Sequence, residues 1–166
     1  MSRSPESDRY TAPPVPDTLY FAYTSLLDPD LIAEVSPGAR FRFTAHYPET
    51  RLDFVASPTH GAIPTLIPEA GHTVWGAVFE IPGAEVGKLT ATEEEAGRVA
   101  DWAEKAVDRE GNKHTCLTFV AKEPPNGGES PDPGYMQAMV RGARYWSLPA
   151  GWVLGLEDLG QDSLFA

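Results

Sequence analysis

The sequence contains a single cysteine, Cys116, and few basic residues for its length. One cysteine cannot form an internal disulfide, which is compatible with a reducing compartment. The formal net charge is −11, from 24 acidic and 13 basic residues, so the surface repels phosphate backbones and we expect no nucleic-acid partner. No apolar stretch approaches the length of a membrane span, and the N-terminus shows no signal-peptide core. We therefore expect a cytoplasmic protein with no membrane partner.

Motifs for metals and nucleotide cofactors are also missing. The histidines do not pair with one another or with cysteine at the spacing of a metal site; they are His46, His60, His72 and His114. No Gly-x-Gly-x-x-Gly, Walker or Gly-x-Ser-x-Gly motif occurs in the chain. We therefore expect no metal and no cofactor, and serine hydrolase chemistry is disfavoured.

Proline and glycine are abundant, with sixteen and fifteen residues among 166. They indicate many short elements joined by turns, which favours a β-rich or α+β fold. The length fits one domain with a single core. Residues 1–17 are polar and proline-rich and are predicted to form a flexible arm, which leaves residues 18–166 for the single domain.

Hydrophobic patterning predicts several strands and helices. Strands are expected at residues 19–22, 41–46, 51–55, 61–67 and 73–81, with a turn at Pro48. Helices are expected from the Asp28-Pro29 cap to Val35, over residues 84–89 and over residues 135–144. The tail from Leu148 should dock on the core through Trp152, Leu154 and Leu156.

Residues 90–107 allow two interpretations. Thr90 and Glu93 have the spacing of a capping box that opens a long helix, with Val99 and Trp102 near helical spacing. Alternatively, residues 102–107 form a strand that turns at residues 109–112 into a second strand at 114–121.

Seven short motifs resemble the γ-glutamylcyclotransferase-like (AIG2-like) family, in the family's order. The first part of the chain has Tyr20 to Pro29, similar to the Tyr-Gly-Ser-Asn loop, then Ser36 to Arg40, Arg51 to Phe54, Gly61 to Leu66 and His72 to Phe79. The second part has Leu89 to Glu93, similar to Leu-Asp-x-x-Glu, and Pro131 to Pro149, similar to the C-terminal helix and its Leu-Pro turn. The resemblance implies an α+β fold with a mixed, partly closed β-barrel and flanking helices. It also favours the strand at residues 102–107.

The resemblance further implies an enzyme that cyclises a γ-glutamyl amide to 5-oxoproline and releases an amine, an amine-releasing lyase or acyltransferase. Its small-molecule substrate would bind at Tyr23, Thr24, Ser25 and Leu26, where successive backbone amides can hold a carboxylate. Glu93 would be the general acid/base, and Tyr135 would contact the substrate or the glutamate. Ring closure within the substrate needs no protein nucleophile, but it does need a proton shuttle.

Structural interpretations of the same residues stay open. Glu93 fits a capping box, and Glu94 or Glu95 could take the catalytic register instead. Tyr23, Trp75 and Tyr135 can be core aromatics. Ser25 can be an ordinary turn residue.

The chain also departs from the family pattern. Thr24 replaces the loop glycine, Leu26 replaces asparagine, and Pro64, Thr90 and Glu94 are further changes. A β-branched residue cannot adopt positive φ cheaply, so Thr24 implies a reshaped loop. These changes indicate a divergent member with a different substrate. The alternatives are a non-catalytic module that binds a small carboxylate on the same barrel, or a repurposed biosynthetic enzyme that cyclises or cleaves another amide. The oligomeric state is left open.

Overall fold

The computed structural model describes residues 15–126, 129 and 131–165. The predicted arm at residues 1–17 lies outside this range except for its last three residues. The elements in chain order are β1 (Thr18–Ala22), η1 (Ser25–Leu27), α2 (Pro29–Val35), β2 (Arg40–Ser57), β3 (Gly61–Ile81), η2 (Gly83–Glu85), α3 (Val86–Glu95), β4 (Arg98–Asp108), β5 (Lys113–Ala121), α4 (Pro133–Tyr145) and α5 (Ala150–Phe165).

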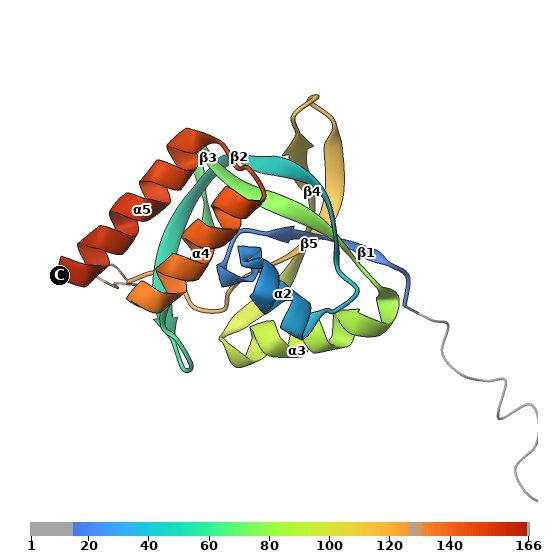
Figure 1. The fold of residues 1–166 in the computed structure, drawn as a ribbon, viewed down its shortest axis with the longest axis horizontal. Helices are drawn as coiled ribbons and strands as arrows, with labels where there is room; N and C mark the ends of the chain where they lie inside the picture. Colours follow the sequence, from blue (N-terminus) through green and yellow to red (C-terminus); the bar gives the residue numbers. More distant parts are fainter. Residues whose placement is uncertain (1–14, 127–128, 130, 166) are drawn as a thin grey trace, which may run out of the picture.

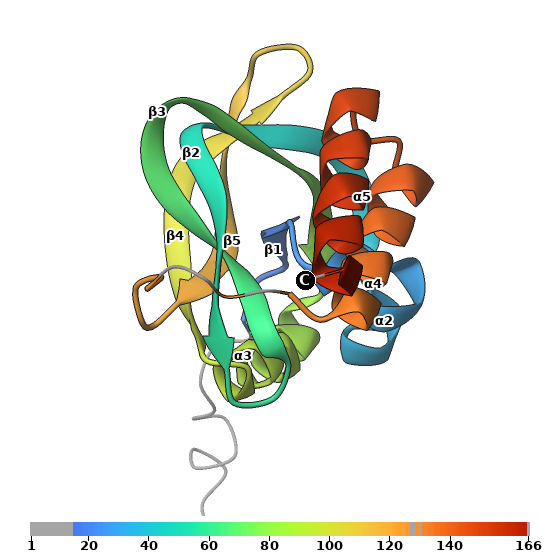
Figure 2. The same cartoon turned by 90° about the vertical axis from the view of Figure 1, so that its left-hand side faces the viewer.

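The strands form a closed barrel in the order β1-β3-β2-β4-β5. All neighbours are antiparallel except β1 and β5, whose parallel pairing joins Tyr20 to Leu117 and closes the sheet. The predicted α+β fold with a mixed barrel is thus confirmed, and the closure is complete. Helices α4 and α5 lie side by side against one wall, while α3 lies near the barrel's end (Figures 1 and 2).

The strands of the β2–β3 hairpin are longer than predicted. The predicted strands at residues 41–46 and 51–55 are parts of β2, and those at residues 61–67 and 73–81 are parts of β3. The predicted turn at Pro48 is wrong. The chain passes this point through a bulge, with Glu49 at φ 53° and Gly71 of β3 at φ 84°. The Gly71 amide donates to Glu49 Oε2 at 2.8 Å, which stabilises the bulge without reversing the chain.

The interpretation of residues 90–107 as one long helix is wrong beyond Glu95, and the strand at residues 102–107 is confirmed as part of β4. Helix α3 already begins at Val86, so Thr90 does not cap it. It ends at Glu95, and Gly97 beyond it takes φ 97°, a conformation that favours glycine. The chain then reverses into β4, where Trp102 is 57% exposed rather than packed on a helix face.

The C-terminal part contains the predicted helix α4 and a further helix, α5, that the sequence did not predict. Leu156 is buried and Trp152 is partly buried against the core, as expected. The expectation for Leu154 is wrong, because its side chain is 61% exposed on the outer face of α5. Among the residues that the structure describes, no helix is long and apolar enough to span a membrane.

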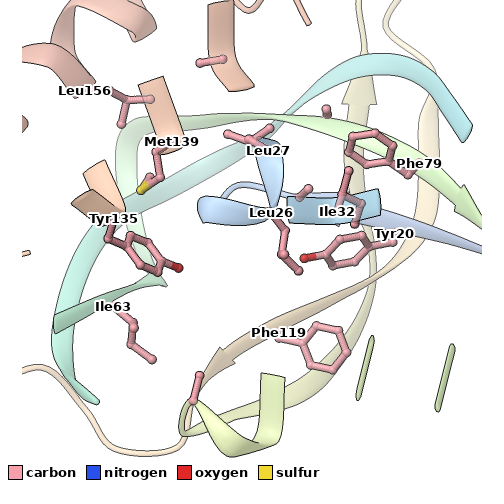
Figure 3. Packing of buried hydrophobic residues seen from close by; sticks show 14 of the residues in the cluster. Tyr20, Leu26, Leu27, Ile32, Ile63, Phe79, Phe119, Tyr135, Met139 and Leu156 are labelled. Atoms are coloured by element: carbon pink, nitrogen blue, oxygen red, sulfur yellow. The ribbon is translucent and has the colours of Figure 1, made fainter. Parts of the chain in front are cut away.

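Helix α4 holds the loop after β1 in place through a very close approach. A Cβ on Gly142 would lie 2.1 Å from the carbonyl carbon of Leu27, so only glycine fits there. The Trp146 indole donates to the Leu27 carbonyl at 2.8 Å, and Arg141 donates to the Asp28 carboxylate at 2.8 Å. Leu26, Leu27, Met139 and Tyr135 consequently belong to one buried cluster (Figure 3).

We predict that Gly142→Ala destabilises the protein by about 1–3 kcal/mol or more, because the added methyl overpacks the contact with Leu27. Denaturant unfolding measures the change. Gly155→Ala, in α5, is the matched control, since a Cβ there meets no atom within 4 Å. The control should gain up to about 1 kcal/mol from helix propensity. Equal stability of the two variants would contradict the packing described here.

Candidate active site

A cavity of about 220 Å³ lies where η1, α2, α3, β4 and α4 meet. Four of the six predicted site residues line it: Ser25, Leu26, Glu93 and Tyr135. They come from three separate elements, η1, α3 and α4. Figure 3 shows the hydroxyl ends of Tyr20 and Tyr135 on either side of Leu26. The structure therefore brings together residues that are distant in the chain.

Glu93 lies in the cavity wall and is only 3% exposed. Its Oε1 accepts a hydrogen bond from Arg98 Nη1 at 3.2 Å. Its Oε2 is buried and has no hydrogen-bond partner within the described part of the chain. Burial raises the pKa of Glu93, and the nearby Arg98 cation opposes that shift. A buried carboxyl with one free oxygen and a raised pKa suits a role in proton transfer.

The neighbouring glutamates differ from Glu93 in their surroundings. Glu94 and Glu95 are both exposed on the last turn of α3. The Thr90 capping-box interpretation fails as well, because Thr90 and Glu93 both lie inside the helix. Of the three candidate registers, the geometry favours Glu93.

Arg98 is a site residue that the sequence analysis missed. It is 2% exposed, at the first position of β4, and its Nη2 donates to the Tyr135 hydroxyl at 2.8 Å. Burial acts to lower the pKa of Arg98, but Tyr135 and Glu93 outweigh it and hold the pKa above its ordinary value. Arg98 is therefore charged at every pH of interest. The one feature of the sequence that could have pointed to Arg98 is its position as a basic residue directly after Gly97 in an otherwise acidic stretch.

The loop after β1 is built differently from the nest that the resemblance implied. Thr24 has φ −107° and ψ −162°, an extended conformation that needs no glycine. Its hydroxyl accepts from the Leu26 amide at 3.2 Å, and its carbonyl accepts from the Leu27 amide at 3.0 Å. These two amides are thus used within the loop, whereas Ser25 and Leu26 still border the cavity.

Tyr23 and Thr24 are buried behind the cavity rather than in its lining. The Tyr23 hydroxyl donates to the Phe119 carbonyl at 2.6 Å, and the ring packs in a second buried cluster together with Phe21 and Tyr47. Burial raises the pKa of Tyr23, so its hydroxyl stays neutral. Trp75 is partly buried against the core and contacts His46, in keeping with its interpretation as a core aromatic.

His60, in the turn between β2 and β3, is a second lining residue that the sequence analysis did not select. Its ring meets Tyr135 edge-on, with centroids 5.7 Å apart. Burial and the Arg98 cation lower the pKa of His60, which favours a neutral imidazole. Within residues 15–126, 129 and 131–165, no group of three or more His, Cys, Asp or Glu side chains is arranged to hold a metal ion.

Comparisons with known proteins give the class to which this fold belongs. The AIG2-like family matches residues 73–156. The gamma-glutamylcyclotransferase of Mus musculus is 30% identical over 138 residues, which cover 79% of this chain and 72% of the relative. The Homo sapiens gamma-glutamylcyclotransferase is 28% identical over 146 residues, covering 84% and 77%.

A solved structure titled gamma-glutamyl cyclotransferase superposes with a TM-score of 0.78 at 27% identity, covering 85% of this chain and 86% of that one. The chain belongs to the AIG2-like family, and its similarity to gamma-glutamylcyclotransferases indicates an enzyme of this family.

We predict that the stability difference between the wild type and Glu93→Gln depends on pH. The folded-state pKa of Glu93 is raised, so its contribution to stability is fully present below the unfolded pKa of roughly 4.3 and is lost as pH rises through the folded pKa. The free energy of unfolding of the wild type should thus fall relative to the variant above about pH 4.5. The fall should reach about 1.4 kcal/mol for each pH unit that separates the folded pKa from the unfolded pKa.

Denaturant unfolding at several pH values between about 4 and 8 measures this trend. Glu94→Gln is the matched control, because it removes one negative charge from the same helix end outside the cavity. A wild-type stability that rises with pH relative to Glu93→Gln would contradict the assignment of a raised pKa.

Proposed function

We propose that this protein cyclises a γ-glutamyl amide to 5-oxoproline and releases the amine, with Glu93 as the general acid/base. The observation that carries the proposal is the Glu93 carboxyl, buried in a cavity with Oε1 fixed by Arg98 and Oε2 free. Ser25 and Leu26 border the same cavity and are the proposed binding loop for the substrate's α-carboxylate. Tyr135 lines this cavity as well.

The proposed reaction needs one proton shuttle and no protein nucleophile. The substrate's α-ammonium, with a reference pKa of roughly 8, gives a proton to Glu93 Oε2 and becomes a nucleophilic amine. That amine attacks the γ-carbonyl carbon and forms the ring. Glu93 returns the first proton to the leaving nitrogen as the bond from this carbon to that nitrogen breaks. The new ring nitrogen then gives its surplus proton to Glu93, which passes it to the released amine, so that 5-oxoproline and an ammonium ion leave.

The cavity walls support this role for Glu93 in two ways. Leu26, Leu31 and Val35 give it an apolar side, which limits water around the carboxyl. Low local polarity strengthens the interaction between Glu93 and a bound ammonium group. Intramolecular ring closure is fast once the reacting atoms are held together, so binding and proton transfer are the protein's main tasks.

We predict that Glu93→Gln lowers the rate of 5-oxoproline formation by roughly 10²- to 10⁴-fold, because glutamine cannot accept the proton. Mass spectrometry of a panel of γ-glutamyl amines and peptides incubated with the protein measures product and released amine. Circular dichroism checks that the variant is folded.

Glu94→Gln and Glu95→Gln are the controls for this experiment. Both residues are exposed on the same turn, so their variants should keep activity within a few-fold of the wild type. Wild-type turnover in Glu93→Gln, or a comparable loss in either control, would overturn the assignment of Glu93.

A second candidate function is a binding module that holds a small carboxylate without catalysis. The observation that favours it is the Thr24 hydroxyl, which occupies the Leu26 amide and leaves fewer loop donors for a carboxylate in a reactive position. Thermal unfolding with γ-glutamyl compounds distinguishes the two functions. The binding module predicts stabilisation by RT ln(1 + [L]/Kd) and no 5-oxoproline from any compound. Product formation from any member of the panel would exclude it.

A further inference from the structure

Arg98 links three other elements at the cavity through a single guanidinium group. Its Nε donates to the Pro64 carbonyl of β3 at 3.3 Å, Nη1 to Glu93 of α3 at 3.2 Å, and Nη2 to the Tyr135 hydroxyl of α4 at 2.8 Å. A buried cation needs a partner charge and hydrogen bonds to be tolerated. Arg98 has both, in an arrangement that directs each of its three nitrogens to a different element.

The geometry of this fork engages one oxygen of Glu93 and leaves the other without a partner among the described residues. The terminal torsion of a glutamate is broad, so an unpaired carboxyl would present either oxygen. The guanidinium is planar and rigid, and its position is fixed by Pro64 and Tyr135. Because Nη1 engages Oε1, Oε2 is the oxygen left without a partner among the described residues.

Arg98 also differs in charge from the other groups that face Glu93. The titratable groups around Glu93 come from four other parts of the chain: Tyr20 in β1 and Tyr23 just after it, Tyr135 in α4, His60 in the β2–β3 turn, and Glu34 in α2. Glu94 and Glu95 follow Glu93 on α3. Burial raises the pKa of Tyr20 and Tyr23, which keeps both neutral, and the pKa of His60 is lowered. Arg98 is therefore the permanent cation of this set.

We propose that Arg98 is a positioning residue that holds Glu93 as a carboxylate with Oε2 directed at the substrate. This inference rests on the proposed function of Glu93 as the acid/base. Arg98 acts through Glu93 and Tyr135 rather than on the reacting atoms. Without it, burial would favour the protonated carboxyl, which cannot take the substrate's proton.

The first test is the pH profile of kcat/KM for 5-oxoproline formation by Arg98→Met. Methionine keeps much of the side-chain volume but removes the cation, so the acid limb of the profile should move up by about one pH unit or more. The activity loss should therefore be largest at low pH and shrink as pH rises. An equal loss at every pH, or no loss, would overturn the proposal, because a purely structural role does not move the limb.

Arg98→Lys is the second variant, and it tests the positioning role of Arg98 even if Arg98→Met does not fold. Lysine keeps the positive charge but cannot engage Pro64, Glu93 and Tyr135 together. We expect an acid limb within about one pH unit of the wild type, together with a kcat roughly tenfold lower. A wild-type kcat in Arg98→Lys would overturn the positioning role.

A readout without turnover separates this proposal from the proposed function. The infrared difference spectrum between a protein with Glu93 and the same protein with Glu93→Gln follows the carboxyl's titration directly. The carboxyl should titrate at a higher pH in Arg98→Met than in the wild type, even if no γ-glutamyl compound is turned over. An unchanged titration in a folded Arg98→Met overturns the role of Arg98, whereas missing turnover with a shifted titration overturns only the proposed function.

Discussion

The buried charge of Arg98 is the constraint on which the site depends. A guanidinium that is 2% exposed needs compensation, and it receives it from Glu93, Tyr135 and Pro64. Each of these partners is placed by a different part of the fold. The turn at Gly97 returns the chain from α3 to β4, so that Arg98 faces the glutamate five residues before it. The close contact of Gly142 with Leu27 places α4, and with it Tyr135, over the loop after β1.

Much of the fold followed from patterns that are local in the sequence. The Asp28-Pro29 cap starts α2 as predicted, with the Asp28 side chain accepting from the Asp30 amide. The same local reasoning failed at Pro48, because a bulge supported by Glu49 and Gly71 lets a proline sit within a continuous strand. Helix α5 was missed because its glycines and its exposed Leu154 obscure a regular apolar face. The β4–β5 hairpin was decided by family resemblance, since the pattern alone allowed a helix.

The candidate site, like the fold, could be predicted from the sequence only in part. Glu93, Ser25, Leu26 and Tyr135 were selected through the resemblance, and the structure gathers all four around one cavity. Tyr23 and Thr24 were selected with them, but their side chains pack behind the cavity. Arg98 escaped notice because its importance comes from contacts with distant residues, such as Tyr135, that no spacing reveals. The loop also accommodates Thr24 without strain, since the backbone of this residue is extended.

A crystal structure of the protein with 5-oxoproline bound is the most direct test of Glu93 as the acid/base. The ring should lie in the cavity between η1 and α3, with its carboxylate toward Ser25 and its ring nitrogen within hydrogen-bond distance of Glu93 Oε2. Glu93 Oε1 should stay on Arg98 in that complex. A product molecule bound away from Glu93, for example in the groove between α4 and α5 that Met136 and Val140 line, would contradict this role of Glu93.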